Sequence, residues 1–190
     1  MAASPADSLR LFVGITVPPD LHAPLLAVRT LTDAPWRWTA PERLHVTLQF
    51  LGNQPREALA PMTAALTALE RHAPVALTIG GWHGFPRHGA ARVLTREIQP
   101  SDALQALHGT TFEALQPWLP AGPAAIFRPH VTLARSKTVL AVPETAVLPL
   151  DWTAGEAHLI ESRLTPQGPD YRVLATFSLG AERWEGSKPG

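Results

Sequence analysis

The tetrapeptide His-Val-Thr-Leu occurs twice in the chain, in LHVTLQFLG (Leu44–Gly52) and in RPHVTLARSK (Arg128–Lys137). The copies begin at His45 and His130. On a β-strand, alternate side chains point to the same face. Each copy therefore predicts an imidazole and a threonine hydroxyl side by side on one face of a strand, with valine and leucine on the other face.

The composition is that of a globular protein without thiol chemistry. The chain has 190 residues, of which 45% are apolar and 17% charged, and it has no cysteine. This length is enough for one domain with a proper core, and the lack of cysteine excludes disulfides, thiolate zinc sites and cysteine nucleophiles. No apolar run approaches the roughly 20 residues that span a bilayer, and no signal peptide is evident. We therefore expect a soluble, cytoplasmic protein with no membrane partner.

The charge distribution is neutral overall but uneven along the chain. The 16 basic and 16 acidic residues cancel, whereas a non-specific duplex binder usually carries a basic excess. We therefore expect any nucleic-acid ligand to be a short or terminal piece held at a local site. Cations gather at the two motifs, with Arg37 and Arg43 before the first and Arg128, Arg135 and Lys137 around the second.

Strands and helices are predicted to alternate without regular βαβ units, which favours an α+β fold. Apolar and β-branched runs predict strands at 9–17, 43–51, 75–81, 91–98, 126–134, 154–164 and 171–179. Helical spacing predicts helices at 19–31, 55–72 and 102–118, the last with Ser101 as its N-cap. The two halves echo each other, so two similar lobes would bring the repeated motifs together.

Strict alternation divides both motif strands into an apolar and a polar face. The apolar side is predicted to hold Leu44, Val46, Leu48, Phe50, Phe127, Pro129, Val131 and Leu133. The polar side is predicted to hold Arg43, His45, Thr47, Gln49, His130, Thr132 and Ala134. We expect the polar faces to line a cleft.

Two histidines and two threonines suit a reaction that moves protons at an anion. Histidine has an unperturbed pKa near 6.5, so both protonation states are available near neutrality. Two imidazoles that flank one substrate atom can act as acid and base, and threonine hydroxyls can hold an anionic oxygen. A single His-x-Thr is usually structural, but two copies with flanking arginines favour a catalytic role. Hydrolysis of a phosphodiester is a reaction of an anion that needs one proton removed and one delivered, so it fits these residues.

The sequence resembles the 2H phosphoesterases, which are named for two His-x-Thr/Ser-x motifs. RLFVGI, PWRWTAPERLHVTLQFLG, FRPHVTLARSK and GPDYRVLATFSL together resemble the bacterial and archaeal RNA 2′,3′-cyclic phosphodiesterases, historically called 2′-5′ RNA ligases. This resemblance covers about residues 9–180. It implies a bilobal fold of two pseudo-symmetric antiparallel-sheet lobes, with helices outside and a central cleft. We expect a monomer with one catalytic domain at 9–184 between flexible tails at 1–8 and 185–190.

The resemblance also implies a metal-independent hydrolysis of 2′,3′-cyclic phosphates, on RNA ends or nucleotides, to 2′-phosphomonoesters. His45 would be the proton donor and His130 the proton acceptor, while Thr47, Thr132 and Arg135 would bind the phosphate. A 5′-hydroxyl that takes the place of water would form a 2′-5′ bond, which is the ligation activity behind the older family name. The chain has no P-loop and no lysine in an adenylation motif. We therefore expect no ATP, no other cofactor and no metal.

Two points stay open at the level of sequence. The motifs are nearly symmetric, so the residues alone permit the reverse assignment of acid and base. Strict alternation also places Arg135 with Val131 and Leu133 on the apolar side, unless the strand ends or bulges near Ala134.

Several other aromatic and histidine side chains could contribute to a site. Phe12, Trp38 and Phe50 could stack on a base, although we expect Phe50 in the core and lean to a structural role for the other two. In WHGFPRHG, His83 and His88 come nearest to a metal-ligand spacing, and a polar loop is the preferred interpretation.

Two rival functions remain. One is a non-catalytic RNA-binding module on the same fold, which the intact histidines and threonines of both motifs disfavour. The other is a 2H enzyme restricted to a small cyclic nucleotide, which a comparison of mononucleotide and oligomer substrates would separate from an RNA-directed enzyme.

Overall fold

The computed structural model describes residues 8–86, 89–120, 126–166 and 168–180. Over this part of the chain the strands form one nine-stranded antiparallel sheet in the order β7-β4-β5-β6-β3-β1-β8-β9, and β2 pairs with β6 outside that order. The strands are β1 (Ser8–Thr16), β2 (Arg37–Trp38), β3 (His45–Pro55), β4 (Val75–Pro86), β5 (Ala90–Ile98), β6 (His130–Ala141), β7 (Leu150–Ala154), β8 (Glu156–Thr165) and β9 (Gly168–Ser178). The α-helices are α1 (His22–Leu26), α2 (Leu59–Leu66) and α3 (Asp102–Leu115).

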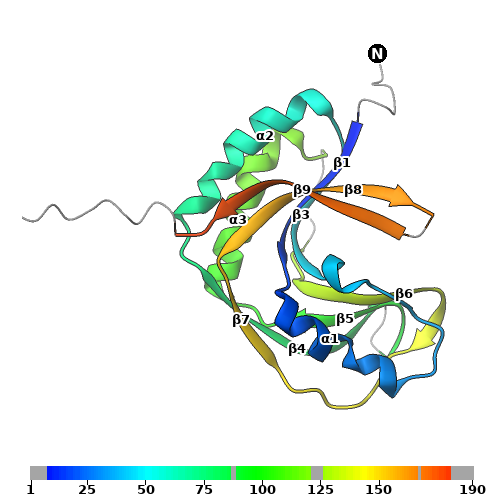
Figure 1. Ribbon diagram of the computed structural model, residues 1–190. Coiled ribbons are helices and arrows are strands. Elements are labelled where there is room, and N and C mark those ends of the chain that lie inside the picture. Colours follow the sequence, from blue (N-terminus) through cyan, green and yellow to red (C-terminus); the bar gives the residue numbers. More distant parts are fainter. Residues whose placement is uncertain (1–7, 87–88, 121–125, 167, 181–190) are drawn as a thin grey trace, which may run out of the picture.

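The two motif strands are neighbours at the centre of this sheet. β3 and β6 run antiparallel and pair at Val46 and Val131. On one side follow β1, β8 and β9, and on the other β5, β4 and β7, so the strand order is symmetric about the central pair (Figure 1). A helical crossover joins β1 to β3 and another joins β5 to β6. The two lobes predicted from the sequence are therefore halves of one continuous, curled sheet.

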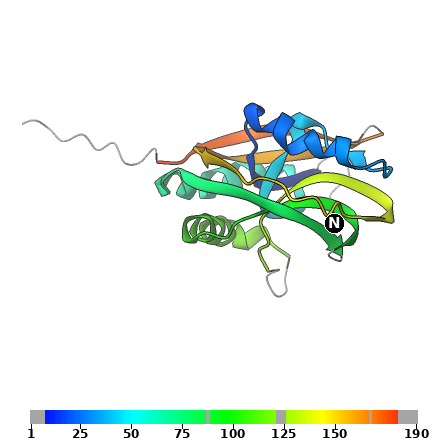
Figure 2. The same ribbon diagram turned by 90° about the horizontal axis from the view of Figure 1, so that it is seen from below.

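The core lies between the sheet and the helices. α2 and α3 lie side by side at one end of the molecule, apart from α1 (Figure 1). In the turned view, α1 and α3 lie on opposite sides of the layer formed by β4, β5 and β6 (Figure 2). The largest fully buried side chains come from strands and helices of both halves: Leu11, Ile15, Leu25, Leu44, Met62, Leu66, Leu69, Leu77, Ile79, Leu94, Leu104 and Leu107. None of the described helices is long and apolar enough to cross a membrane.

The third predicted helix forms where its cap indicated. The Ser101 hydroxyl accepts a hydrogen bond from the Leu104 backbone N–H at 3.2 Å, as predicted for the N-cap. Leu104, Leu107 and Leu115 are buried, but Phe112 is only half-buried. Thr111 is fully buried instead, and its hydroxyl donates to the Leu107 carbonyl at 2.7 Å.

The first two predicted helices are correct in place but are not continuous α-helices. Residues 19–31 form a 3₁₀ turn, α1 and a second 3₁₀ turn, and residues 56–71 follow the same pattern around α2. Pro24 and Pro61 lie in the first turns of α1 and α2, where a missing N–H breaks no intrahelical bond. These prolines therefore disfavour α-helices that begin further upstream, where the chain forms 3₁₀ turns instead.

The strands differ from the predicted ranges mainly in length. β3 passes through Gly52, beyond its predicted end at 51, because glycine accepts the φ of +68° found there. β6 begins at His130 rather than at 126 and continues to Ala141, while β2 and β7 were not predicted. Ser8 belongs to β1 and not to a tail. The rest of the predicted tails, at 1–7 and 185–190, lies outside the described residues.

We predict opposite effects from adding one methyl group at two glycines. A Cβ on Gly14, in β1, would lie 2.8 Å from the Val46 carbonyl oxygen of β3, so Gly14→Ala should lower the free energy of unfolding by about 1–3 kcal/mol. A Cβ on Gly109, in α3, would meet nothing within 4 Å, so Gly109→Ala should raise it by roughly 0.5–1 kcal/mol. Urea denaturation measures both, and a Gly14→Ala protein of unchanged stability would contradict the close approach of β1 to the first motif.

Candidate active site

The two motif histidines are held by the same local hydrogen bond. His45 Nδ1 lies 2.7 Å from the Arg43 carbonyl oxygen, and His130 Nδ1 lies 2.7 Å from the Arg128 carbonyl oxygen. A carbonyl oxygen can only accept a hydrogen bond, so Nδ1 carries a proton in each ring. In each neutral ring Nε2 is then the unprotonated nitrogen, which can take up a proton. Once the ring is charged, Nε2 can release that proton again.

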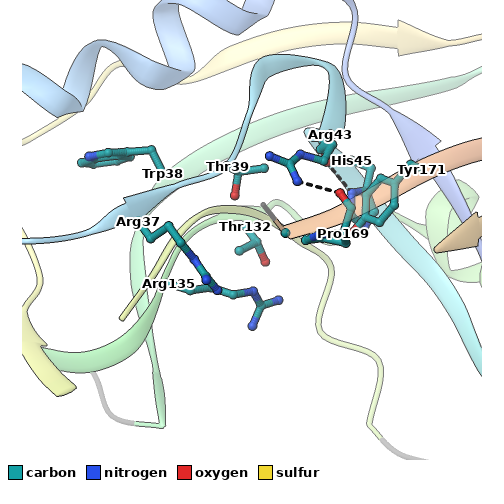
Figure 3. Close-up of a pocket in the computed structure, with 10 residues that line it drawn as sticks. Arg37, Trp38, Thr39, Arg43, His45, Thr132, Arg135, Pro169 and Tyr171 are labelled. Atoms are coloured by element: carbon teal, nitrogen blue, oxygen red, sulfur yellow. Dashed lines mark hydrogen bonds between the residues drawn. The ribbon is translucent and has the colours of Figure 1, made fainter. Parts of the chain in front are cut away.

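The central strand pair arranges the motifs crosswise. In an antiparallel register that passes through Val46 and Val131, position 45 lies opposite position 132, and position 47 lies opposite position 130. In agreement, His45 and Thr132 line one pocket (Figure 3). Thr47 is half-buried on the same face of β3 as His45. Each histidine is therefore placed with the threonine of the other motif.

A β-bulge brings Arg135 into this pocket. Thr132 pairs with Thr95 of β5 and Ala134 pairs with Leu94, so Leu133 is an extra residue between two paired ones. A bulge shifts the alternation of side chains by one position. As a result Ala134 is buried, contrary to strict alternation, and Arg135 returns to the side of Thr132 and lines the pocket with His45. The bulge considered from the sequence is confirmed.

The first motif bulges at the equivalent leucine. Thr47 pairs with Gly14 of β1 and Gln49 pairs with Val13, which leaves Leu48 as the extra residue. The shift turns Phe50 outward, where it is 47% exposed with the Arg10 guanidinium 4.7 Å from its ring centroid. The prediction that Phe50 lies in the core is therefore wrong. Phe50 and Arg135 follow their motif histidines at the same spacing in the sequence. The first motif therefore presents an exposed aromatic ring where the second presents a cation.

The wall beside His45 comes from a distant hairpin. The guanidinium of Arg43 donates to the Pro169 carbonyl oxygen at 2.6 Å, and this contact ties the start of β9 to the first motif (Figure 3). Gly168 has a φ of +116°, and a Cβ there would lie 3.0 Å from Arg43 Nη1, so glycine is required for this approach. The contact holds Tyr171 at a ring-centroid distance of 5.3 Å from His45.

Aromatic rings enclose the imidazole of His45. The ring of Phe12 lies 4.8 Å from His45 and 5.1 Å from Tyr171, and Phe12 is only 3% exposed. Phe12 is therefore a buried support for the histidine and not a platform for a base. Trp38 is half-buried, lines the pocket and has the Arg29 guanidinium 5.6 Å from its ring. Tyr171 carries no motif in the sequence, and only the match of GPDYRVL to the closing strand pointed to its region.

The surroundings of His130 are different. Phe85 of β4 lies 5.2 Å from His130 and 4.8 Å from His83, measured between ring centroids. His83 Nδ1 lies 3.0 Å from the Glu97 carboxylate. All four line a second pocket. The expectation of a polar loop is wrong for His83, which lies in β4, and His88 lies outside the described residues.

Burial and neighbouring cations hold both catalytic candidates toward the neutral state. Burial lowers the pKa of His45, the hydrogen bond to Arg43 raises it, and the positive charges of His130 and Arg135 lower it further. Burial also lowers the pKa of His130, the bond to Arg128 opposes this, and Arg135 and His83 add to the lowering. The charge of His130 therefore reaches His45, and Arg135 acts on both imidazoles. The described residues include no group of three or more histidines and carboxylates placed to hold a metal ion.

We predict that stability falls as the pH drops below about 6.5. The folded-state pKa values of His45 and His130 lie below the ordinary value of 6.5, so between the two values the unfolded chain binds more protons. Unfolding in urea at about pH 7.5 and pH 5.5 should show a loss on the order of 1 kcal/mol from these groups. The double variant His45→Gln/His130→Gln should depend less on pH, and an unchanged dependence would contradict the lowered values.

Known proteins resemble the chain along most of its length. The family model of the 2′-5′ RNA ligase superfamily matches residues 17–165. An RNA 2′,3′-cyclic phosphodiesterase of Thermus thermophilus is 31% identical over 96% of this chain and 97% of its own, and one of Archaeoglobus fulgidus is 31% identical over 72% of this chain and 80% of its own.

Solved structures agree on the fold. A crystal structure of a Thermus thermophilus protein covers 92% of this chain and 100% of its own, with 32% identity and a TM-score of 0.77. E. coli LigT in its apo form, at 24% identity, covers 91% of this chain and 98% of its own with a TM-score of 0.75. The bilobal 2H phosphoesterase fold is thereby confirmed, and the chain belongs to the 2′-5′ RNA ligase superfamily.

Proposed function

We propose that this protein hydrolyses 2′,3′-cyclic phosphates on RNA ends or nucleotides to 2′-phosphomonoesters, with two histidines as acid and base. The observation that carries the proposal is the pair of imidazoles at the centre of one sheet, each with Nδ1 bound to a backbone carbonyl and Nε2 left for proton transfer. The relatives named RNA 2′,3′-cyclic phosphodiesterase support the same reaction.

Each proton in the reaction has a source and a destination. The Nε2 of neutral His130 takes a proton from water as the water oxygen attacks phosphorus. The bond between phosphorus and the 3′ oxygen breaks, and His45 Nε2–H delivers a proton to that oxygen. The product carries its phosphate on the 2′ oxygen. A 5′-hydroxyl that attacks phosphorus in place of water, with the same bond to the 3′ oxygen breaking, would form a 2′-5′ bond.

The phosphate binds between the two motifs in this scheme. Thr132 and Arg135 line the pocket with His45, so they can hold the non-bridging oxygens where the negative charge lies. Thr47, on the His45 face of β3, would supply a second hydroxyl. Both histidines belong to one chain, so we propose that residues 9–184 act as one catalytic domain of a cytoplasmic monomer.

The substrate itself supplies the charge that the acid needs. In the free protein, burial and the nearby cations lower the pKa of His45, which disfavours the imidazolium. A bound phosphate anion acts in the opposite direction, because an opposite charge within a few Å favours the charged form. His45 therefore becomes an effective acid when the phosphate binds.

We predict that His45→Ala and His130→Ala each lower kcat for a 2′,3′-cyclic nucleotide by at least about 100-fold, the range of general acid–base catalysis. His72→Ala is the matched control, because His72 contacts Thr110 among the helices and should keep its rate. All assays contain EDTA, and product analysis should give the 2′-phosphate. Near-normal turnover in both single variants would exclude the mechanism, and a rate that EDTA abolishes and a metal restores would exclude its metal independence.

The pH profile should be bell-shaped, with its acid limb for kcat/KM below pH 6.5. This limb reports the base in the free protein, and burial lowers the pKa of His130 from 6.5. The basic limb of kcat should lie at higher pH than that of kcat/KM, since the bound anion raises the pKa of the acid.

A substrate with sulfur in place of the 3′ oxygen should distinguish acid from base. A thiolate leaves without protonation, because its pKa is far below that of an alkoxide. His45→Ala should therefore recover most of its lost rate on the 3′-thio cyclic substrate, whereas His130→Ala should not. Recovery in His130→Ala alone would reverse the two roles.

A further inference from the structure

A further hollow adjoins the pocket beside His45 and is distinct from the pocket beside His130. We call it the outer hollow. Arg37 and Arg135 line both the outer hollow and the pocket beside His45. The remaining lining residues of the outer hollow are Pro35, Arg92, Val93, Ser136, Lys137 and Thr138. It thus combines four cations with two hydroxyl side chains, and no carboxylate and no aromatic ring line it. We call Arg37, Arg92, Arg135 and Lys137 the basic groove.

Three neighbouring strands place these cations together. Arg37 of β2 lies directly opposite Arg135 of β6, and Val93, next to Arg92, pairs with Arg135 from β5. Figure 3 shows the side chains of Arg37 and Arg135 next to each other. Lys137 follows Arg135 by two residues on β6 and lines the same hollow. The basic groove therefore continues outward from the catalytic pocket along the β2–β6–β5 surface.

This arrangement is unfavourable for folding by itself. Like charges directly opposite each other on paired strands destabilise a sheet. The chain is neutral overall, with 16 acidic residues available, yet the ion pairs among the described residues join His83 to Glu97, His158 to Glu156 and Arg163 to Glu161. No described carboxylate forms an ion pair with a cation of the basic groove. An anionic ligand that spans the groove would balance this charge.

The cations of the groove exceed what one cyclic phosphate requires. A cyclic phosphodiester carries a single negative charge, and His45, Thr132 and Arg135 already line the first pocket, where it would bind. Arg92 and Lys137 line only the outer hollow. They would instead face the next phosphates of a strand whose end lies between His45 and His130.

We propose that the basic groove binds the backbone phosphates of a single-stranded RNA whose 2′,3′-cyclic end occupies the active site. This inference rests on the proposed function and assigns the contacts to the backbone phosphates next to the cyclic end to Arg92 and Lys137. Arginine and lysine with hydroxyl groups are the usual partners of backbone phosphates. Contacts to phosphates carry no sequence information, so binding in the groove should show no base preference.

The test compares two substrates and two double variants. The substrates are a 2′,3′-cyclic mononucleotide and a short RNA oligomer with a cyclic end. Arg92→Gln/Lys137→Gln removes the two outer cations, and Arg56→Gln/Arg71→Gln is the matched control, since it removes two arginines that flank α2. The groove variant should raise KM for the oligomer by about tenfold and flatten the log–log salt dependence of its kcat/KM by roughly 1.4, because each single-strand phosphate contact contributes about 0.7. Its kcat/KM for the mononucleotide should change less than about twofold.

The outcomes separate this inference from the proposed function. Equal losses on both substrates, or no loss on the oligomer, would overturn the basic groove as a binding track while leaving the hydrolysis intact. If the wild-type protein turned over neither substrate, the proposed function would fail. Fluorescence anisotropy with a 3′-phosphorylated oligomer would then test the groove alone. Binding that the groove variant weakens and the control keeps would support it, and equal binding by both would overturn it.

Discussion

The pairing of Val46 with Val131 is the contact on which the rest of the site depends. Both valines are completely buried, and they join the two halves of the sheet at its centre. Because the pairing is antiparallel, it sets each motif histidine beside the threonine of the other motif. A slip of β6 by one residue would turn His130 away from the cleft and Val131 into it. The same apolar contact that joins the two halves therefore fixes the placement of the two motif histidines.

Symmetry alone would give two identical halves, whereas hydrolysis needs an acid and a base with different surroundings. The bulges at Leu48 and Leu133 turn one further residue of each strand outward. In β6 that residue is Arg135, a charge beside the phosphate pocket, and in β3 it is Phe50, an exposed ring. Both halves have a β-bulge at the equivalent leucine, so the difference between them comes from the side chain that each bulge turns outward.

How far the sequence predicts the structure follows from the range of the interactions involved. The faces of His45, Val46, His130 and Val131 follow from strand alternation, and the Ser101 cap follows from a hydrogen bond between residues three apart. These depend on local geometry. The outward turn of Phe50 depends on the register with β1, which no pattern within β3 reveals. For the same reason, strict alternation could not decide the position of Arg135.

The sequence also does not reveal contacts between residues that are distant along the chain. Tyr171 reaches His45 because Arg43 hydrogen-bonds to Pro169 across the site. His83 reaches the vicinity of His130 because β4 extends to Pro86.

Proton transfer and substrate binding are coupled through one balance of charge. Arg10, Arg43 and Arg135 all act electrostatically on Tyr171, yet burial raises the pKa of its hydroxyl, so it remains a neutral donor near His45. The imidazoles are disfavoured as cations by the same burial and by positive charge that includes Arg135. Burial, together with nearby fixed positive charge, thus disfavours protonation of both histidines in the free protein. In the proposed mechanism, the phosphate that the arginines attract is also the group that favours a charged His45, so substrate binding and activation of the acid would occur in one step.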